Sequence, residues 1–210
     1  MPLSYLDFRE KLFPQGIFSI SQVRLHFPAF NSDNLLFWQK KGYILLLRKG
    51  WYCFREFTQV PEFSFLVANN LYAPSYISHQ EALLFYGLIP EHVVDSTSVT
   101  TKKTESFNVQ GKIYKYYSIH PKFFFGYVLK NMTVNGWTRS FMIADREKAI
   151  LDLLYLFPFY KREEDLAEIR LNTSVLEKDI DWQKMDEYLG KFSIKILEKK
   201  VRLIRKIHQL

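Results

Sequence analysis

The stretch KKGYILLLRKGWYCF at residues 40–54 limits the fold of this chain more than any other part of it. Two apolar runs, Tyr43–Leu47 and Trp51–Phe54, flank the short basic turn Arg48-Lys49-Gly50. Apolar runs of this length on either side of a glycine-containing turn predict a β-hairpin. The two cations at its tip are either solvated or placed to meet phosphate.

Three short helices are predicted before this hairpin. Apolar spacing predicts the first over Leu3–Phe13, Ser19 is placed to cap the second, and Asn31 or Ser32 to cap the third. Three short helices followed directly by a hairpin are the order of a winged helix-turn-helix. In that fold the third helix enters the major groove of DNA and the hairpin tip touches the backbone beside it. We therefore predict a winged helix-turn-helix DNA-binding domain over residues 1–57.

The net charge of +7 is concentrated at the two ends of the chain. Residues 1–57 hold eight basic against four acidic residues, residues 58–190 hold 14 against 17, and residues 191–210 hold seven against one. Charge divided in this way favours a polyanionic partner, although a solvated basic surface would show the same pattern. The partner predicted here is double-stranded DNA.

The predicted DNA contacts lie on the third helix and on the hairpin turn. With Leu35 and Trp38 turned inward, Asn and Gln side chains on this helix could read adenine, and lysines could meet phosphate or guanine. Cations at a helix end also compensate the helix dipole, which is the structural alternative. The candidate DNA-binding residues are Asn34, Gln39, Lys40, Lys41, Arg48 and Lys49.

Residues 58–210 are predicted to form a mixed α+β domain. Ser78 and Glu81 have the spacing of a capping box that opens a helix, and His92–Lys103 is rich in strand-forming residues. Two further hairpins are predicted, with turns at Gln110-Gly111 and at Asn135-Gly136. Helices follow, and the last of them, Ile194–Ile207, is strongly basic.

No catalytic residue, metal site or cofactor site is predicted. Asp145, Glu147 and Asp152 form a carboxylate group, but acids at a helix start are commonly capping residues. His79 has no acid or cysteine at a spacing that would build a triad or a metal site, and Cys53 is expected to be a buried thiol. The chain shows neither a signal peptide nor an apolar run long enough to span a membrane, so a cytoplasmic protein is expected.

Four blocks of the sequence resemble the AbiEi family of antitoxins and transcriptional regulators. The likeness runs from about Phe8 to Tyr188, and its most specific parts are Tyr72–Glu91 and Ala144–Tyr155. The blocks are W-x-K-K-G-Y-I…R-K-G-x-Y, A-N-x-L-Y-x-P-S-Y-I-S-x-x-x-A-L-x-x-Y-G-L-I-P-E, T-S-V-T-T-K-K-T and A-D-x-E-K-A-x-L-D-L-L-Y.

The resemblance implies a repressor and antitoxin of a type IV toxin–antitoxin system. Its winged helix-turn-helix would bind repeats in its own promoter, and its C-terminal domain, residues 58–210, would counter a nucleotidyltransferase-like toxin without a stable complex. Two alternatives stay open. One is a stand-alone winged-helix regulator whose second domain senses a ligand or dimerises, and the other is a nucleic-acid-processing enzyme that uses the carboxylates near Asp145–Asp152.

Overall fold

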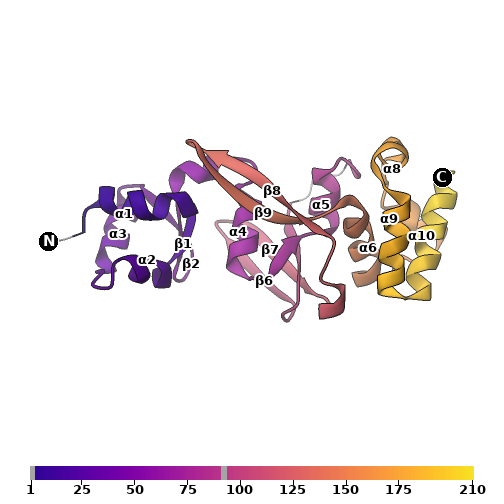
Figure 1. Ribbon diagram of the computed structural model, residues 1–210, viewed down its shortest axis with the longest axis horizontal. Helices are drawn as coiled ribbons and strands as arrows, with labels where there is room; N and C mark the ends of the chain where they lie inside the picture. Colours follow the sequence, from indigo (N-terminus) through magenta and orange to yellow (C-terminus); the bar gives the residue numbers. More distant parts are fainter. Residues whose placement is uncertain (1–2, 91–93) are drawn as a thin grey trace.

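The computed structural model of the protein describes residues 3–90 and 94–210. Within them the chain forms ten α-helices and two β-sheets, so the predicted α+β class is confirmed. Figure 1 shows these elements in a row, with a small unit at the N-terminal end, a larger sheet in the middle and a group of helices at the C-terminal end. In the described part of the chain, no helix combines the length and apolar character that crossing a membrane requires.

The N-terminal unit contains the predicted three helices and hairpin. Ser19 caps the second helix through a capping box, because its hydroxyl accepts from the backbone N–H of Gln22 and the Gln22 side chain accepts from the backbone N–H of Ser19. At the third helix Asn31 rather than Ser32 supplies the side-chain acceptor, to the N–H of Asp33. The elements are α1 (Tyr5–Leu12), α2 (Ile20–His26), α3 (Asp33–Lys40), β2 (Ile44–Arg48) and β3 (Trp51–Phe54).

A third strand, β1 (Ile17–Ser19), joins the hairpin and was not predicted. It pairs antiparallel with β3, so the small sheet has the order β1-β3-β2 and Ile17 lies opposite Cys53. Three residues are too few to show the alternation that marks a strand in a sequence. The Cys53 side chain is fully buried, and burial raises the pKa of its thiol to about 12, which agrees with the expected inert thiol.

Aromatic rings fill the core of this unit. Phe8 of α1 lies at its centre, with its ring centroid 4.4 Å from Trp38 of α3 and 5.3 Å from Phe18 of β1. Phe54 of β3 packs on the same ring at 5.8 Å. All four side chains are at most 3% exposed, so α1, α3 and the small sheet are held together by one aromatic cluster.

The middle of the molecule is a six-stranded mixed sheet of order β6-β7-β5-β4-β9-β8. The pairs β4–β9 and β5–β7 are parallel and the other three pairs are antiparallel. Both predicted turns are confirmed, since Gln110-Gly111 joins β6 to β7 and Asn135-Gly136 joins β8 to β9. The strands are β4 (Ser75–Ile77), β5 (Ser96–Thr100), β6 (Glu105–Val109), β7 (Lys112–Ser118), β8 (Tyr127–Val134) and β9 (Trp137–Ala144).

Two strands of this sheet differ from the prediction. β5 covers only part of the strand predicted over His92–Lys103, whose first two residues lie outside the described part of the chain. β4 was not predicted, because its three residues are all buried and so show no alternation of polar and apolar side chains.

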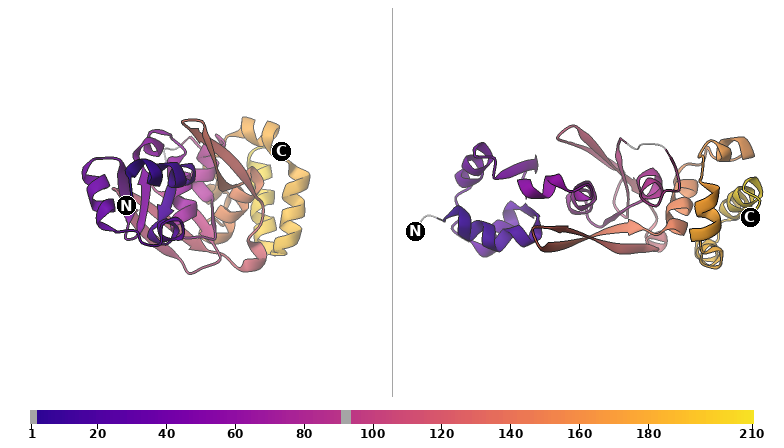
Figure 2. Two further views of the ribbon diagram at one scale, coloured as in Figure 1. Left: turned by 60° about the vertical axis from the view of Figure 1, so that its left-hand side comes forward. Right: turned by 90° about the horizontal axis from the view of Figure 1, so that it is seen from above.

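The two edge hairpins of this sheet both reach the N-terminal unit. Figure 2 shows β8 and β9 extending toward that unit, and Trp137 at their turn shares a surface hollow with Phe13 and Arg9. At the other edge, the Gln110 side chain in the β6–β7 turn donates to the backbone oxygen of Leu46 on β2 at 3.1 Å. The N-terminal unit is thus contacted from both edges of the larger sheet.

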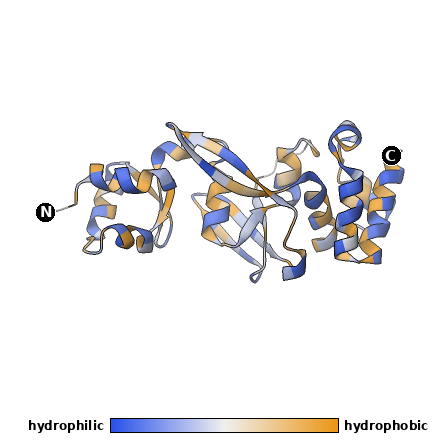
Figure 3. Ribbon diagram, in the orientation of Figure 1, coloured by the Kyte–Doolittle hydropathy of each residue, from blue (hydrophilic) through white to orange (hydrophobic). Residues whose placement is uncertain are grey.

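Seven helices accompany the larger sheet. Figure 3 shows both hydrophilic and hydrophobic residues on α9 and α10, as expected of helices that bury one side only. The short α8 was not predicted, and α10 matches the predicted basic helix. Their bounds are α4 (Phe63–Leu71), α5 (His79–Phe85), α6 (Arg146–Leu156), α7 (Glu163–Ala167), α8 (Thr173–Asp179), α9 (Trp182–Phe192) and α10 (Lys195–Ile207). Three short 3₁₀ turns, Phe13–Gln15, Arg55–Gln59 and Pro121–Phe123, complete the described elements.

The capping box predicted for Ser78 and Glu81 is wrong, although Ser78 does precede α5. The Ser78 hydroxyl donates instead to Asp152 of α6 at 2.8 Å. Glu81 accepts from the Ser96 hydroxyl at 2.5 Å and from the backbone N–H of Thr97 at 3.1 Å. Both side chains therefore hydrogen-bond to residues of other elements. In a capping box these buried partners would be left without a hydrogen bond.

Asp152 lies at the centre of a fully buried polar network. It forms an ion pair with Lys148 one helical turn earlier and accepts from the hydroxyl groups of Ser78 and Tyr76. Lys148 also donates to the Tyr76 hydroxyl at 2.8 Å. Burial raises the pKa of the Asp152 carboxyl and lowers that of the Lys148 ammonium, and each charge opposes the shift of the other.

We predict that Lys148→Met lowers the free energy of unfolding by about 3–5 kcal/mol, because it leaves the Asp152 carboxylate buried without a countercharge. Adding Asp152→Asn should restore part of this loss, since the amide oxygen still accepts from Ser78 and Tyr76 but carries no charge. Urea denaturation of both variants measures the difference. A double variant no more stable than the single one would show that the unpaired charge is not the cause.

Candidate nucleic-acid interface

The exposed side of α3 is the first part of the predicted DNA-binding surface. Leu35 and Trp38 point inward as predicted, at 1% and 3% exposure. Successive residues of an α-helix are about 100° apart, so the side opposite this pair is formed by positions 33, 36, 37 and 40. Leu36 and Phe37 at its centre are 60% and 55% exposed. This side of α3 is thus apolar in the middle, with Asp33 and Lys40 beside the apolar pair.

Asn34 and Gln39 lie at the border of this exposed side. Both are half-buried, and the Gln39 amide donates to the backbone oxygen of Leu35 in its own helix at 3.1 Å. Their contacts with bases stay a prediction. Leu36 and Phe37 are not among the predicted contacts, because only polar and basic residues were considered, although the helical repeat places them opposite the pair Leu35 and Trp38.

Lys40 and Lys41 are exposed at the C-terminal end of α3. Gly42 then turns the chain into β2 with a φ of +72°, a conformation that favours glycine. Cations at this helix end are stabilised by the helix dipole, and they also form a positive edge beside the apolar pair. The Lys41 ammonium lies 5.6 Å from the Phe37 ring centroid.

The two cations at the hairpin turn have different surroundings. Lys49 is exposed. Arg48 is half-buried, and its guanidinium carbon lies 4.1 Å from the ring centroid of Phe107 on β6. Stacking of this kind uses the flat face of the guanidinium and leaves the N–H groups at its edge. The sequence could not show this contact, because Phe107 belongs to the other sheet.

Lys41 and Lys49 lie at opposite ends of β2. A five-residue strand is roughly 15 Å long at about 3.3 Å per residue. The cations of the α3 end and the cation of the hairpin tip are therefore set apart and do not form one cluster.

The carboxylates considered for catalysis all have partners within the protein. Asp145 caps α6 by accepting from the backbone N–H of Lys148 and also accepts from the Tyr188 hydroxyl at 2.8 Å. Glu147 accepts from the backbone N–H of Asp181 and pairs with Lys184 at 2.7 Å. Asp152 is wholly buried. The expected capping by Asp145 is confirmed, and among residues 3–90 and 94–210 no group of acids, histidines and cysteine is arranged to hold a metal ion.

Three basic residues of α10 have partners on other helices, although only Lys200 among them is buried. Lys200 is buried and donates at 2.6 Å to the backbone oxygen of Leu154, near the C-terminal end of α6. Arg205 pairs with Asp186 at 2.8 Å, and Lys206 pairs with Glu163 at 2.5 Å. Lys195 and Lys199 are exposed, and in the described structure no ion pair engages either of them.

His79 is the most unusual polar residue of the described structure. It is fully buried with a φ of +55°, and neither ring nitrogen has a hydrogen-bond partner among the described residues. Its ring lies 4.8 Å from Tyr117 and 5.2 Å from Phe157. Burial, assisted by the charge of Lys148, lowers the pKa of His79 to about 3.

We predict that His79 makes the fold less stable as the pH falls. The unfolded chain binds a proton at this residue near pH 6.5, whereas the folded chain binds it only near pH 3. The neutral imidazole therefore contributes fully to the free energy of unfolding above pH 6.5. Between pH 6.5 and pH 3 this contribution is lost, at up to about 1.4 kcal/mol per pH unit. The slope of unfolding free energy against pH should therefore be smaller in His79→Phe. Equal slopes in the unchanged protein and in His79→Phe would contradict the assignment.

No model of a known protein family matches this sequence, and no curated protein matches it either. Any functional conclusion therefore depends on the residues and geometry of this chain. The exposed side of α3 and the hairpin tip are the surface features that point most directly to a partner.

Proposed function

We propose that the protein is a DNA-binding transcriptional repressor and the antitoxin of a type IV toxin–antitoxin system, as its resemblance to the AbiEi family implies. In this proposal residues 1–57 are a winged helix-turn-helix that binds promoter repeats of the protein's own operon. Residues 58–210 are the antitoxin domain, which counters a nucleotidyltransferase-like toxin without a stable complex.

The observation that carries the DNA-binding half is the succession α2, α3 and β2–β3 with exposed cations at both ends of β2. This is the order in which a winged helix-turn-helix presents its recognition helix and its wing. The separation of roughly 15 Å between the two cationic ends is comparable with the major-groove width of about 12 Å. Lys40 and Lys41 can then lie on one phosphate strand while Lys49 meets the other.

The apolar pair on α3 adds a specific expectation about the operator. Leu36 and Phe37 are the exposed apolar side chains of this helix. In the major groove the apolar group that a base presents is the methyl of thymine. Promoter repeats rich in A·T pairs at the position under α3 would suit this helix, with Asn34 and Gln39 placed at the side of the contact.

Arg48 suits the wing role in a particular way. Its guanidinium is already ordered against Phe107, so less side-chain entropy is lost when its edge binds a phosphate oxygen. Phe107 would in this role be a positioning residue for a DNA contact.

Support for the antitoxin half comes from the two most family-like blocks. Tyr76 and Ser78 of the block Tyr72–Glu91 bind Asp152 and Lys148 of the block Ala144–Tyr155. The residues that carry the resemblance thus form one buried network at the centre of the second domain.

We predict that Arg48→Ala with Lys49→Ala weakens binding to the upstream promoter at all salt concentrations and flattens its salt dependence. Loss of two phosphate contacts should reduce the slope of log K against log[salt] by about 2. Gel shifts at a series of salt concentrations measure this slope. The matched control is Lys195→Ala with Lys199→Ala, which removes the same charge from α10 at the opposite end of the molecule (Figure 1).

A slope that is unchanged in the Arg48 and Lys49 variant would remove the hairpin from the interface. Equal losses in the hairpin and α10 variants would indicate attraction by net charge alone.

We predict that the same hairpin variant still protects cells from the toxin. Neutralisation is assigned to residues 58–210, so co-expression of the variant with a neighbouring nucleotidyltransferase-like gene should restore growth as well as the unchanged protein does. Colony counts with and without induction of the toxin measure protection. Failure of the unchanged protein to protect would leave the stand-alone regulator as the better proposal.

A further inference from the structure

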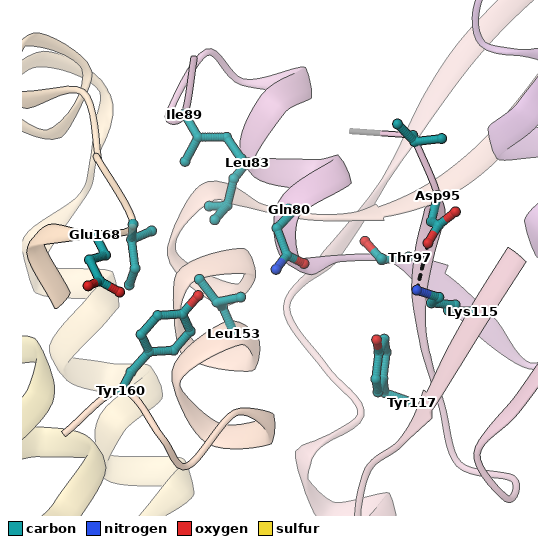
Figure 4. A pocket seen from close by; sticks show the side chains of 12 residues that line it. Gln80, Leu83, Ile89, Asp95, Thr97, Lys115, Tyr117, Leu153, Tyr160 and Glu168 are labelled. Atoms are coloured by element: carbon teal, nitrogen blue, oxygen red, sulfur yellow. Dashed lines mark ion pairs between the residues drawn. The ribbon is translucent and has the colours of Figure 1, made fainter. Parts of the chain in front are cut away.

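A cavity of about 400 Å³ lies between the larger sheet and the helices beside it, away from the proposed DNA surface. Figure 4 shows side chains from α5, α6, β7 and the segments around β5 and α7 turned toward it. Its volume is in the range of small-molecule sites. Its apolar wall consists of Leu83, Ile89, Leu153 and Ile169.

The polar groups of this cavity are largely without protein partners. Among the described residues, no hydrogen bond or ion pair engages the Gln80 amide, the hydroxyls of Tyr117 and Tyr160 or the Glu168 carboxylate. Gln80, Tyr117 and Tyr160 are half-buried and Glu168 is exposed, so the cavity is open to solvent and a ligand that enters it can bind these groups. Tyr117 also packs on His79, the buried residue with a φ of +55° whose ring nitrogens have no partner among the described residues.

The charges around the cavity limit the ligand class. Lys115 is already paired with Asp95 at 2.6 Å, and among the described residues no ion pair engages the Glu168 carboxylate. An anionic ligand would meet this carboxylate, and the described residues that line the cavity offer no cation other than the paired Lys115 to bind it. A cationic ligand would be attracted by Glu168 and by the faces of the tyrosine rings.

From these features we infer that the cavity binds a small aromatic amine. Its planar body would pack between Tyr117 and the apolar wall, and its protonated amine would lie near Glu168 and Tyr160. The Gln80 amide, at the start of α5, would hydrogen-bond to a polar atom of the ring system. This inference does not depend on the proposed DNA binding.

Tryptamine and indole-3-propionate test the inference as a matched pair, because they share an indole ring and a short chain but carry opposite charges. Isothermal titration calorimetry of the full chain should give a dissociation constant on the order of 1 mM or tighter for tryptamine. Indole-3-propionate should bind at least about tenfold more weakly, because its carboxylate meets Glu168. Equal affinities, or no binding of tryptamine at about 10 mM, would overturn the inference.

Glu168→Gln locates the amine. This exposed residue can lose its charge without disturbing the fold, and the variant should bind tryptamine about five- to tenfold more weakly and lose its preference over indole-3-propionate. Glu177→Gln removes an exposed charge from α8, outside the cavity, and should change neither affinity. A tryptamine affinity that Glu168→Gln leaves unchanged would place the amine elsewhere and contradict the site.

Adenosine monophosphate is the informative competitor, since it offers a planar base of similar size with a negative charge. Tighter binding of this nucleotide than of tryptamine would overturn the aromatic-amine class and assign the cavity to nucleotides. Gel shifts with the promoter are a separate measurement, so loss of the DNA-binding proposal and loss of the ligand site can be told apart.

Discussion

The buried network around Asp152 is the interaction on which the larger sheet and the helices beside it depend. β4 runs through the middle of the larger sheet, and Tyr76 and Ser78 attach it to α6 through Asp152 and Lys148. A buried charge that loses its partners costs several kcal/mol, so the network favours the position of α6 against the sheet that keeps these contacts. α6 in turn supplies Leu153 to the cavity wall and the backbone oxygen that Lys200 of α10 binds.

The larger sheet also determines how the N-terminal unit is presented. The turns of its two edge hairpins contact that unit, one through Gln110 at Leu46 and the other through Trp137 beside Phe13. Contacts at two separated places restrain rotation more than a single linker would. The exposed side of α3 and the hairpin tip are therefore offered to a partner in a defined orientation, and Arg48 is ordered by Phe107 before any partner arrives.

Charge in the sequence and charge on the surface differ for a physical reason. The last twenty residues are strongly basic, yet Lys200, Arg205 and Lys206 are used to bind a helix end and two acidic side chains. Burying the amphipathic face of α10 brings these groups close to acceptors on α6, α7 and α9. In the described structure the basic charge left without an ion-pair partner, including that of Lys195 and Lys199, is therefore less than the composition of this segment indicates, although Lys206 itself stays exposed.

Local signals in the sequence were sufficient for most elements, since periodic apolar residues, Ser19 and the glycine-containing turns act over a few residues. They determined the three N-terminal helices, the three hairpins, the α+β class and the positions of the cations along the chain. They failed at β1, β4 and α8, which are too short for a pattern, and at Ser78, whose partner Asp152 is 74 residues away. Only the tertiary structure decided that Asn34 and Gln39 are half-buried, that Arg48 stacks on Phe107, and that several polar groups without a partner among the described residues meet around one cavity. These depend on which distant elements pack together, and a pattern of neighbouring residues carries no information on that packing.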